Sequence, residues 1–230
     1  MISVFIPHWF TRFDIMIELF SFLVLLTFFI MSIRNYKLTE NKKLFYLGLG
    51  FLFIALAEIA TILTKFVIYY KTTLFQVVGG VVLKYDILKA SDISYDLGFF
   101  LYKFLTLAGL YVIYRLPLND KNIGDIVLAG FFILLSSLAG QFIFFIFHLT
   151  VLLFLVLIID TYLKVYKKNK SCKTKLLLIA FSILTASHLI FLLQGLPQLY
   201  IIGQIMQLIS YLTLLVLVIK INKNENSKRK

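Results

Sequence analysis

The feature that most limits the fold of this chain is a series of apolar runs separated by short polar and basic segments. A run of about 20 apolar residues forms a helix that crosses the ~30 Å hydrocarbon core of a membrane. Hydrophobic residues make up 61% of the 230 residues, more than a water-soluble fold of this size buries. A transmembrane β-barrel requires alternation with a period of two, which these runs lack. The sequence therefore predicts an all-α, polytopic membrane protein.

Seven spans are expected, and the division of the longest apolar stretch decides that number. Residues 126–159 contain no Asp, Glu, Lys or Arg. A single helix of that length would be about 51 Å long, far more than the membrane core requires. The basic segments on either side, Arg115–Lys121 and Lys164–Lys175, should both be cytoplasmic, so two crossings must separate them. We therefore place a turn at Leu138–Gln141. The predicted spans are residues 14–33, 44–70, 93–114, 126–139, 141–159, 176–193 and 199–219.

The net charge of +12 is better explained by membrane topology than by nucleic-acid binding. Lys and Arg are concentrated in the loops 34–43, 115–121 and 164–175 and in the tail 220–230. By the positive-inside rule these segments are cytoplasmic and the N-terminus is outside the cell membrane. The spans are not interrupted by basic-aromatic platforms, so no nucleic-acid partner is expected. The expected partners are the lipid bilayer and a cytoplasmic or membrane signalling protein, and the Lys, Ile, Phe and Tyr bias indicates a prokaryotic source.

The longest connection, Lys71–Asp92, has a pattern of its own. Two runs rich in β-branched residues flank Gly79-Gly80. This pattern predicts a β-hairpin with a primed turn on the outer side, between the second and third spans. A short amphipathic surface segment is the alternative.

The two halves of the chain repeat each other. Glu18–Thr64 aligns without a gap on His148–Gln194. The identical positions include Leu19/Leu149, Leu23/Leu153, Leu25/Leu155, Tyr36/Tyr166, Lys37/Lys167, Lys43/Lys173, Leu47/Leu177 and Phe51/Phe181. The third helices align more weakly, with Gly98 on Gly203. We therefore predict a first triple-helix repeat at 14–114, a linker helix at 126–139, a second repeat at 141–219 and a basic cytoplasmic tail at 220–230. Because the linker is one span, the repeats share one orientation and are related by a pseudo-two-fold axis along the membrane normal.

This layout of three helices, a linker and three helices resembles that of two families. One comprises the sugar-exporter and PQ-loop transporters, and the other the microbial rhodopsins. The resemblance does not extend to motifs. PQ-loop proteins carry Pro-Gln within their repeats, whereas Pro197-Gln198 lies between the sixth and seventh spans. A rhodopsin binds retinal through a lysine in its seventh span, and Leu199–Ile219 contains no lysine, so covalent retinal is not expected there.

Polar residues occupy equivalent positions in the two repeats. Glu18 aligns with His148, and Glu58 aligns with His188. Counted from the basic residues at the inner boundary, all four lie roughly 23 Å above the cytoplasmic edge. An isolated charge at such depth costs about 2.5–3.5 kcal/mol, so these side chains should face inward and pair. Three further polar residues are expected at similar depth, which gives a predicted ligand-binding layer of Glu18, Glu58, Lys103, His148, His188, Gln204 and Gln207.

Three functions remain open for this layer. A receptor- or sensor-like protein would bind a small ligand or ion in an outward-facing polar pocket. A small-solute or proton-coupled transporter would use the carboxylates and histidines as proton relays. An enzyme or electron-transfer protein would hold zinc, iron or a b-type haem on His148 and His188, although Lys103 would repel a cation. Because the expected spans contain no proline that would kink them, the receptor-like function is preferred. No catalytic residue is assigned.

A purely structural alternative also exists for the polar layer. In it, Glu58 forms an ion pair with Lys103, and the histidines bond to neighbours such as Ser187. Outside the layer, Asp160 is expected to pair with Lys164 one helical turn later. Lys65 is expected to extend to the outer membrane surface.

Overall fold

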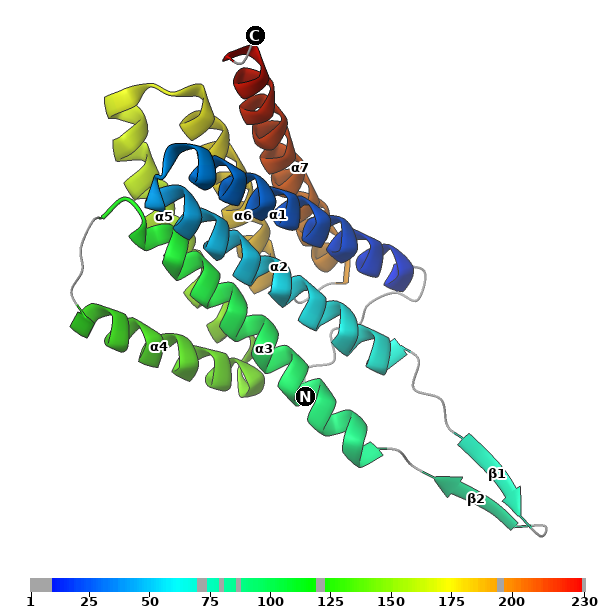
Figure 1. Cartoon of the computed structure of the whole chain (residues 1–230). Coiled ribbons are helices and arrows are strands. Elements are labelled where there is room, and N and C mark those ends of the chain that lie inside the picture. Colours follow the sequence, from blue (N-terminus) through cyan, green and yellow to red (C-terminus); the bar gives the residue numbers. More distant parts are fainter. Residues whose placement is uncertain are drawn as a thin grey trace.

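The computed structural model describes residues 10–69, 74–78, 81–85, 88–118, 123–193 and 197–228. Over these residues it contains seven long helices and one pair of strands (Figure 1). In chain order the elements are α1 (Thr11–Thr39), α2 (Lys42–Tyr69), β1 (Leu74–Val78), β2 (Val81–Tyr85), α3 (Leu88–Arg115), α4 (Ile123–Phe142), α5 (Phe144–Asn169), α6 (Cys172–Leu192) and α7 (Pro197–Lys228). Each helix is long and apolar enough to cross a membrane. The predicted multi-pass helical membrane protein with seven spans is therefore confirmed.

The long apolar stretch is divided into two helices, as the charge argument predicts, but the turn lies later than expected. Residues 138–141 remain in α4, and the chain turns at Ile143, whose backbone is extended. Gly140 explains the shift, because a Cβ at this position would lie 3.2 Å from Phe147 Cβ. The glycine thus lets the first turn of α5 approach the last turn of α4, so the helix needs no earlier break.

The C-terminal helix is also longer than predicted. The sequence analysis ends the last span at Ile219 and expects a tail from residue 220, whereas α7 continues to Lys228. Residues 220–228 contain neither glycine nor proline, so the backbone can continue as a helix beyond the apolar span.

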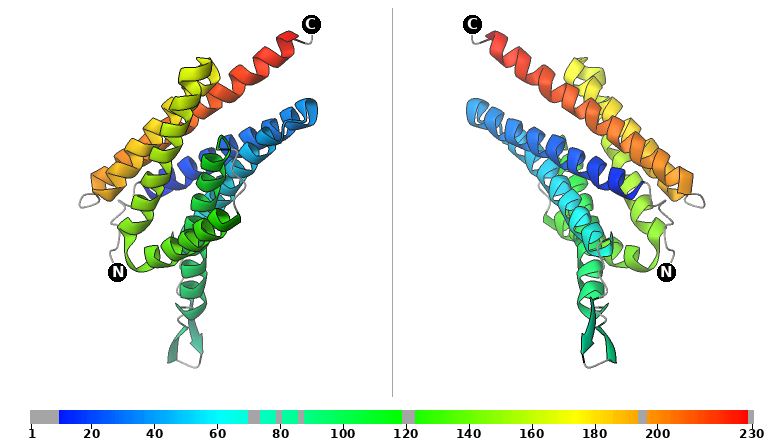
Figure 2. Two further views of the ribbon diagram at one scale, coloured as in Figure 1. Left: turned by 90° about the vertical axis from the view of Figure 1, so that its left-hand side faces the viewer. Right: turned by 90° about the vertical axis from the view of Figure 1, so that its right-hand side faces the viewer.

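The helices form two packed groups, the first triplet (α1–α3) and the second triplet (α5–α7). Within each triplet the middle helix packs against the other two. Between the triplets, α1 contacts α7 and α3 contacts α5, while α4 packs against α3 and α5 (Figure 2). Exchanging α1 with α5, α2 with α6 and α3 with α7 leaves the contacts among these six helices unchanged, whereas the contacts of α4 with α3 and α5 do not follow the exchange. An internal repeat would produce the same pattern, although the repeat, its symmetry and the orientation in the membrane remain predictions.

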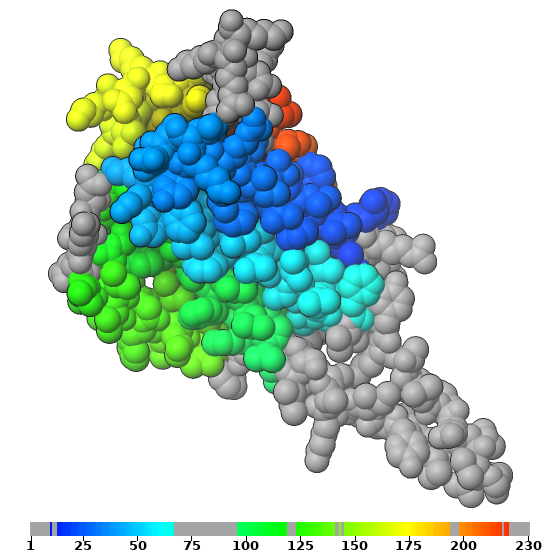
Figure 3. Space-filling view, in the orientation of Figure 1, coloured from blue at the N-terminus to red at the C-terminus, as the bar shows by residue number. Residues whose placement is uncertain are grey.

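The first triplet presents one continuous surface (Figure 3). Large apolar side chains such as Leu19, Leu23 and Leu63 are exposed on it, as expected of helix faces that contact lipid. Inside the triplet, glycines bring α2 and α3 together. A Cβ at Gly109 would lie 2.6 Å from the Gly50 carbonyl oxygen, which is closer than van der Waals contact allows.

Replacing Gly109 by alanine is therefore expected to lower the stability of the helical bundle by about 1–3 kcal/mol, because backbone must move to accept the methyl group. Gly130→Ala is the matched control, since a Cβ there meets nothing within 4 Å. The control should be neutral or slightly stabilising, because alanine favours helix by about 1 kcal/mol over glycine. Thermal unfolding in a mild detergent measures both effects. Equal stability of the two variants would show that α2 and α3 are not packed this closely.

The two strands pair in antiparallel register, with Leu74 opposite Tyr85 and Val78 opposite Val81. They occur where the sequence suggests a hairpin, between α2 and α3. The turn expected at Gly79-Gly80 lies outside the described residues.

Candidate functional site

Three buried charged side chains meet between α1 and α2. Lys65 Nζ of α2 lies 2.5 Å from Asp14 Oδ2 and also donates to Glu18 Oε1, both on α1. The exposed fractions are 0% for Asp14, 4% for Glu18 and 6% for Lys65. Asp14 and Glu18 lie one helical turn apart, so α1 presents both carboxylates on the same face. The prediction that Lys65 extends to the membrane surface is wrong, because two buried carboxylates hold its ammonium group inside the protein.

A tyrosine of α7 completes this acid–lysine cluster, which we define as Asp14, Glu18, Lys65 and Tyr200. The Tyr200 hydroxyl donates to Asp14 Oδ1 at 3.0 Å. It accepts hydrogen bonds from Lys65 Nζ at 3.3 Å and from Gln204 Nε2, one turn later on α7, at 3.1 Å. The cluster therefore connects the first triplet to α7 of the second.

Asp14 and Tyr200 are functional candidates that the sequence analysis missed. Asp14 lies at the start of the first predicted span, where a charge needs no explanation. The signal that could have identified it is its spacing of four residues from Glu18. Tyr200 is one of 13 tyrosines in the chain, and its sequence position alone does not distinguish it from the others.

Glu58 forms a second polar group between the triplets. Its Oε1 atom accepts hydrogen bonds from the Tyr211 hydroxyl at 3.0 Å and from Gln207 Nε2 at 3.3 Å, both on α7. Gln207 Nε2 also donates to the Tyr211 hydroxyl at 3.2 Å. Glu58 is only 4% exposed and lies close enough to Lys65 and Asp14 for electrostatic interaction.

The ion pair between Glu58 and Lys103, expected in the structural alternative, is not formed between these two described side chains. Lys103 Nζ donates to the Gly140 carbonyl oxygen at 2.8 Å and lies 5.9 Å from the centroid of the Phe99 ring. Gly140 belongs to the last turn of α4, where backbone carbonyls lack helical partners and the helix dipole favours a cation. Lys103 therefore faces α4 rather than α2.

The two predicted histidines contact each other inside the second triplet. His148 Nδ1 of α5 and His188 Nδ1 of α6 lie 3.0 Å apart, and both side chains are buried. In this arrangement one Nδ1 carries a hydrogen and the other accepts it. The expected bond from Ser187 to a histidine is not made, because the Ser187 hydroxyl donates to the Gly203 carbonyl oxygen instead. Phe191 separates the histidine pair from the acid–lysine cluster, with ring contacts to His148 and to Tyr200.

The seven predicted residues thus belong to several contact groups, and their role as a ligand-binding layer stays a prediction. Glu18 belongs to the acid–lysine cluster, which Gln204 contacts through Tyr200. Glu58 and Gln207 form the second group, the histidines form a pair, and Lys103 contacts α4. Within the residues whose side chains the structure describes, no group of three or more His, Cys, Asp and Glu is arranged to hold a metal ion.

The charges of the two polar groups between the triplets do not balance. Among the residues whose side chains the structure describes, Asp14, Glu18 and Glu58 bring three carboxylates to a region in which Lys65 supplies the one ammonium group. Glu18 Oε2 is buried and has no hydrogen-bond partner among the described residues. Because an uncompensated charge is costly away from water, this region favours the uptake of protons or a small cation.

Comparison of the chain with protein-family models, with curated proteins and with solved structures gives no match. The site is therefore interpreted from its own chemistry.

Proposed function

We propose that this chain is a proton-coupled membrane carrier for a small solute, and that the buried carboxylates of α1 and α2 bind the coupling proton. The observation that carries the proposal is the excess of carboxylates over lysine among the described side chains between the triplets. Buried ionisable groups of this kind occur in the proton relays of membrane pumps and transporters. Glu58, which accepts hydrogen bonds from the neutral side chains of Tyr211 and Gln207, is one suitable position for the proton. The oxygen of Glu18 that has no hydrogen-bond partner among the described residues is another.

Because of the position of the carboxylates, binding of a proton would change how tightly the two triplets contact each other. Asp14 and Glu58 accept hydrogen bonds from Tyr200 and Tyr211 of α7, so their charge contributes to the contact between the triplets. A protonated carboxyl group accepts these bonds less strongly than a carboxylate does. Protonation would therefore loosen the contact of α1 and α2 with α7.

The other contact between the triplets has a different chemistry. Where α3 and α5 meet, aromatic rings pack against each other, including Tyr102 against Phe147 and Tyr111 against Phe154. These ring contacts contain no carboxylate and should not respond to protons. A bundle with one proton-sensitive and one proton-insensitive contact can rock about the latter, which is the motion that alternating access requires.

A receptor- or sensor-like function is the second candidate. It is favoured because the helices α1 to α6 contain no proline, and α7 has one, at its first residue, whereas many transporters bind their substrates at broken helices. In this function the same carboxylates would respond to a small ligand or ion, and a signalling partner would detect the movement of the triplets.

Proton entry into liposomes tests the carrier proposal. The purified protein is reconstituted with a pH-sensitive dye inside, and sugars, amino acids and small cations are supplied outside at acidic pH. We expect one class of solute to accelerate internal acidification, and Glu58→Gln to abolish this acceleration because the glutamine cannot take up a proton. Asp160→Asn is the matched control, since this carboxylate is exposed and pairs only with Lys164 at 2.6 Å, as predicted.

Two outcomes would contradict the carrier proposal. Solute-dependent acidification that persists in Glu58→Gln would remove this carboxylate from the coupling step. A solute that binds the protein without any accompanying proton entry would support the receptor-like function instead.

A further inference from the structure

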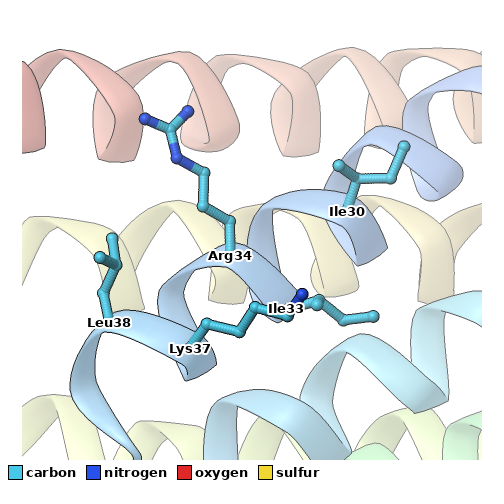
Figure 4. A pocket seen from close by; sticks show the side chains of 5 residues that line it. All are labelled: Ile30, Ile33, Arg34, Lys37 and Leu38. Atoms are coloured by element: carbon cyan, nitrogen blue, oxygen red, sulfur yellow. The ribbon is translucent and has the colours of Figure 1, made fainter.

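A shallow groove runs along the last turns of α1, far from the buried polar groups. It is lined by Ile30, Ile33, Arg34, Lys37 and Leu38 (Figure 4). In the view of Figure 4, the Arg34 side chain projects away from α1 toward α7. Ile30 and Leu38 are more than half exposed, and the described part of the chain provides neither Arg34 nor Lys37 with an ion pair.

The corresponding end of α5 shows what is unusual about this groove. In the alignment of the two halves, Arg34 and Lys37 correspond to Lys164 and Lys167. Ile30, however, corresponds to Asp160, whose carboxylate pairs with Lys164 at 2.6 Å. The α5 end thus neutralises part of its own positive charge, whereas the α1 end places its positive charge beside apolar surface.

This combination matches one class of ligand. Two cations next to exposed isoleucine and leucine side chains, at the end of a membrane span, complement an anionic headgroup attached to an acyl chain. Arginine binds phosphate oxygens through a planar fork of donors, and lysine adds a point charge. A free phosphate ion would use the cations only, and a neutral lipid would use the apolar residues only.

We propose that the α1 groove is a binding site for an anionic phospholipid. The phosphate lies between Arg34 and Lys37, and an acyl chain lies along Ile30 and Ile33. This proposal does not depend on the carrier function.

Lipid binding to the full-length protein in a neutral detergent tests the site. The delipidated protein is titrated with phosphatidylglycerol or with phosphatidylcholine of identical chains, and bound lipid is counted by native mass spectrometry. We expect a preference for phosphatidylglycerol that Arg34→Gln/Lys37→Gln weakens roughly thirtyfold, the combined effect expected of two basic residues at a membrane surface. Lys164→Gln/Lys167→Gln removes the same charge at the equivalent positions and should leave the preference unchanged.

One further exchange tests the site without changing either of the two basic residues. Ile30→Asp gives α1 the aspartate that α5 has, so it should pair with Arg34 and abolish the preference. Isoleucine at an exposed position should not be needed for folding, and unchanged thermal unfolding without lipid verifies this. Glycerol phosphate is added as a competitor to separate recognition of the phosphate alone from recognition of the lipid.

Three results would overturn the proposal. Equal loss of preference in the α1 and α5 double variants would show general electrostatic attraction without a site. Equal binding of the two lipids by the unchanged protein would show that the cations are not used. Full displacement by glycerol phosphate at the lipid's own concentration would show that the apolar residues contribute nothing.

Discussion

Lys65→Met is expected to lower the stability of the helical bundle by about 3–5 kcal/mol, because removal of one partner leaves buried charge uncompensated. Methionine has a similar volume, so the variant removes the ammonium group without creating a large cavity. Asp14 and Glu18 would then lie one helical turn apart without the ammonium group that contacts both of them. Thermal unfolding in nanodiscs measures the loss.

Two further variants show whether the loss comes from charge. Asp14→Asn/Glu18→Gln/Lys65→Met removes all three charges and should recover most of the stability, since a buried ion group replaced by neutral residues is often tolerated. Lys103→Met removes a lysine that is also buried but donates to a neutral carbonyl, so it should cost about 1 kcal/mol, close to the value of one hydrogen bond. A Lys65→Met variant as stable as the unchanged protein would show that the acid–lysine cluster is not formed.

Some features of this protein can be predicted from sequence because they depend on position along the helix axis. Apolar runs of membrane length predict the seven spans, and the basic loops require the division of residues 126–159. Residue counting also predicts that Glu18, Glu58, His148 and His188 lie at one depth in the membrane. All four side chains are buried, as an inward-facing layer requires.

The partners of these residues could not be predicted, because they depend on rotation about the helix axis. In a soluble helix, one polar face reveals this rotation. In a membrane helix, the face toward lipid is as apolar as the face toward the protein, so the pattern carries little rotational information. Lys103 illustrates the consequence: its depth matches Glu58, yet it faces Gly140 of α4. Lys65 lies near the C-terminal end of α2, and its contacts with Asp14 and Glu18 of α1 and with Tyr200 of α7 explain why it stays inside.

Tyr200→Phe is expected to produce the second large loss of stability, about 2–4 kcal/mol, because the hydroxyl takes part in three buried hydrogen bonds, two of them with charged groups. Without it, Asp14 Oδ1 and Gln204 Nε2 lose the bonds that the hydroxyl makes to them. The effect should also extend to function, since Tyr200 connects Asp14 of the first triplet to the second triplet. In the liposome assay, we expect slower solute-dependent acidification in this variant.

Tyr162→Phe provides a control with the same chemical change. The Tyr162 hydroxyl is buried and has no hydrogen-bond partner among the described residues. Its removal should therefore leave stability unchanged or raise it by about 1 kcal/mol, since a buried polar group without a partner is itself unfavourable. Thermal unfolding of both variants under one condition gives the comparison. If Tyr162→Phe were as damaging as Tyr200→Phe, the loss would reflect tyrosine packing in general, and the contact between Asp14 and α7 would not hold the triplets together.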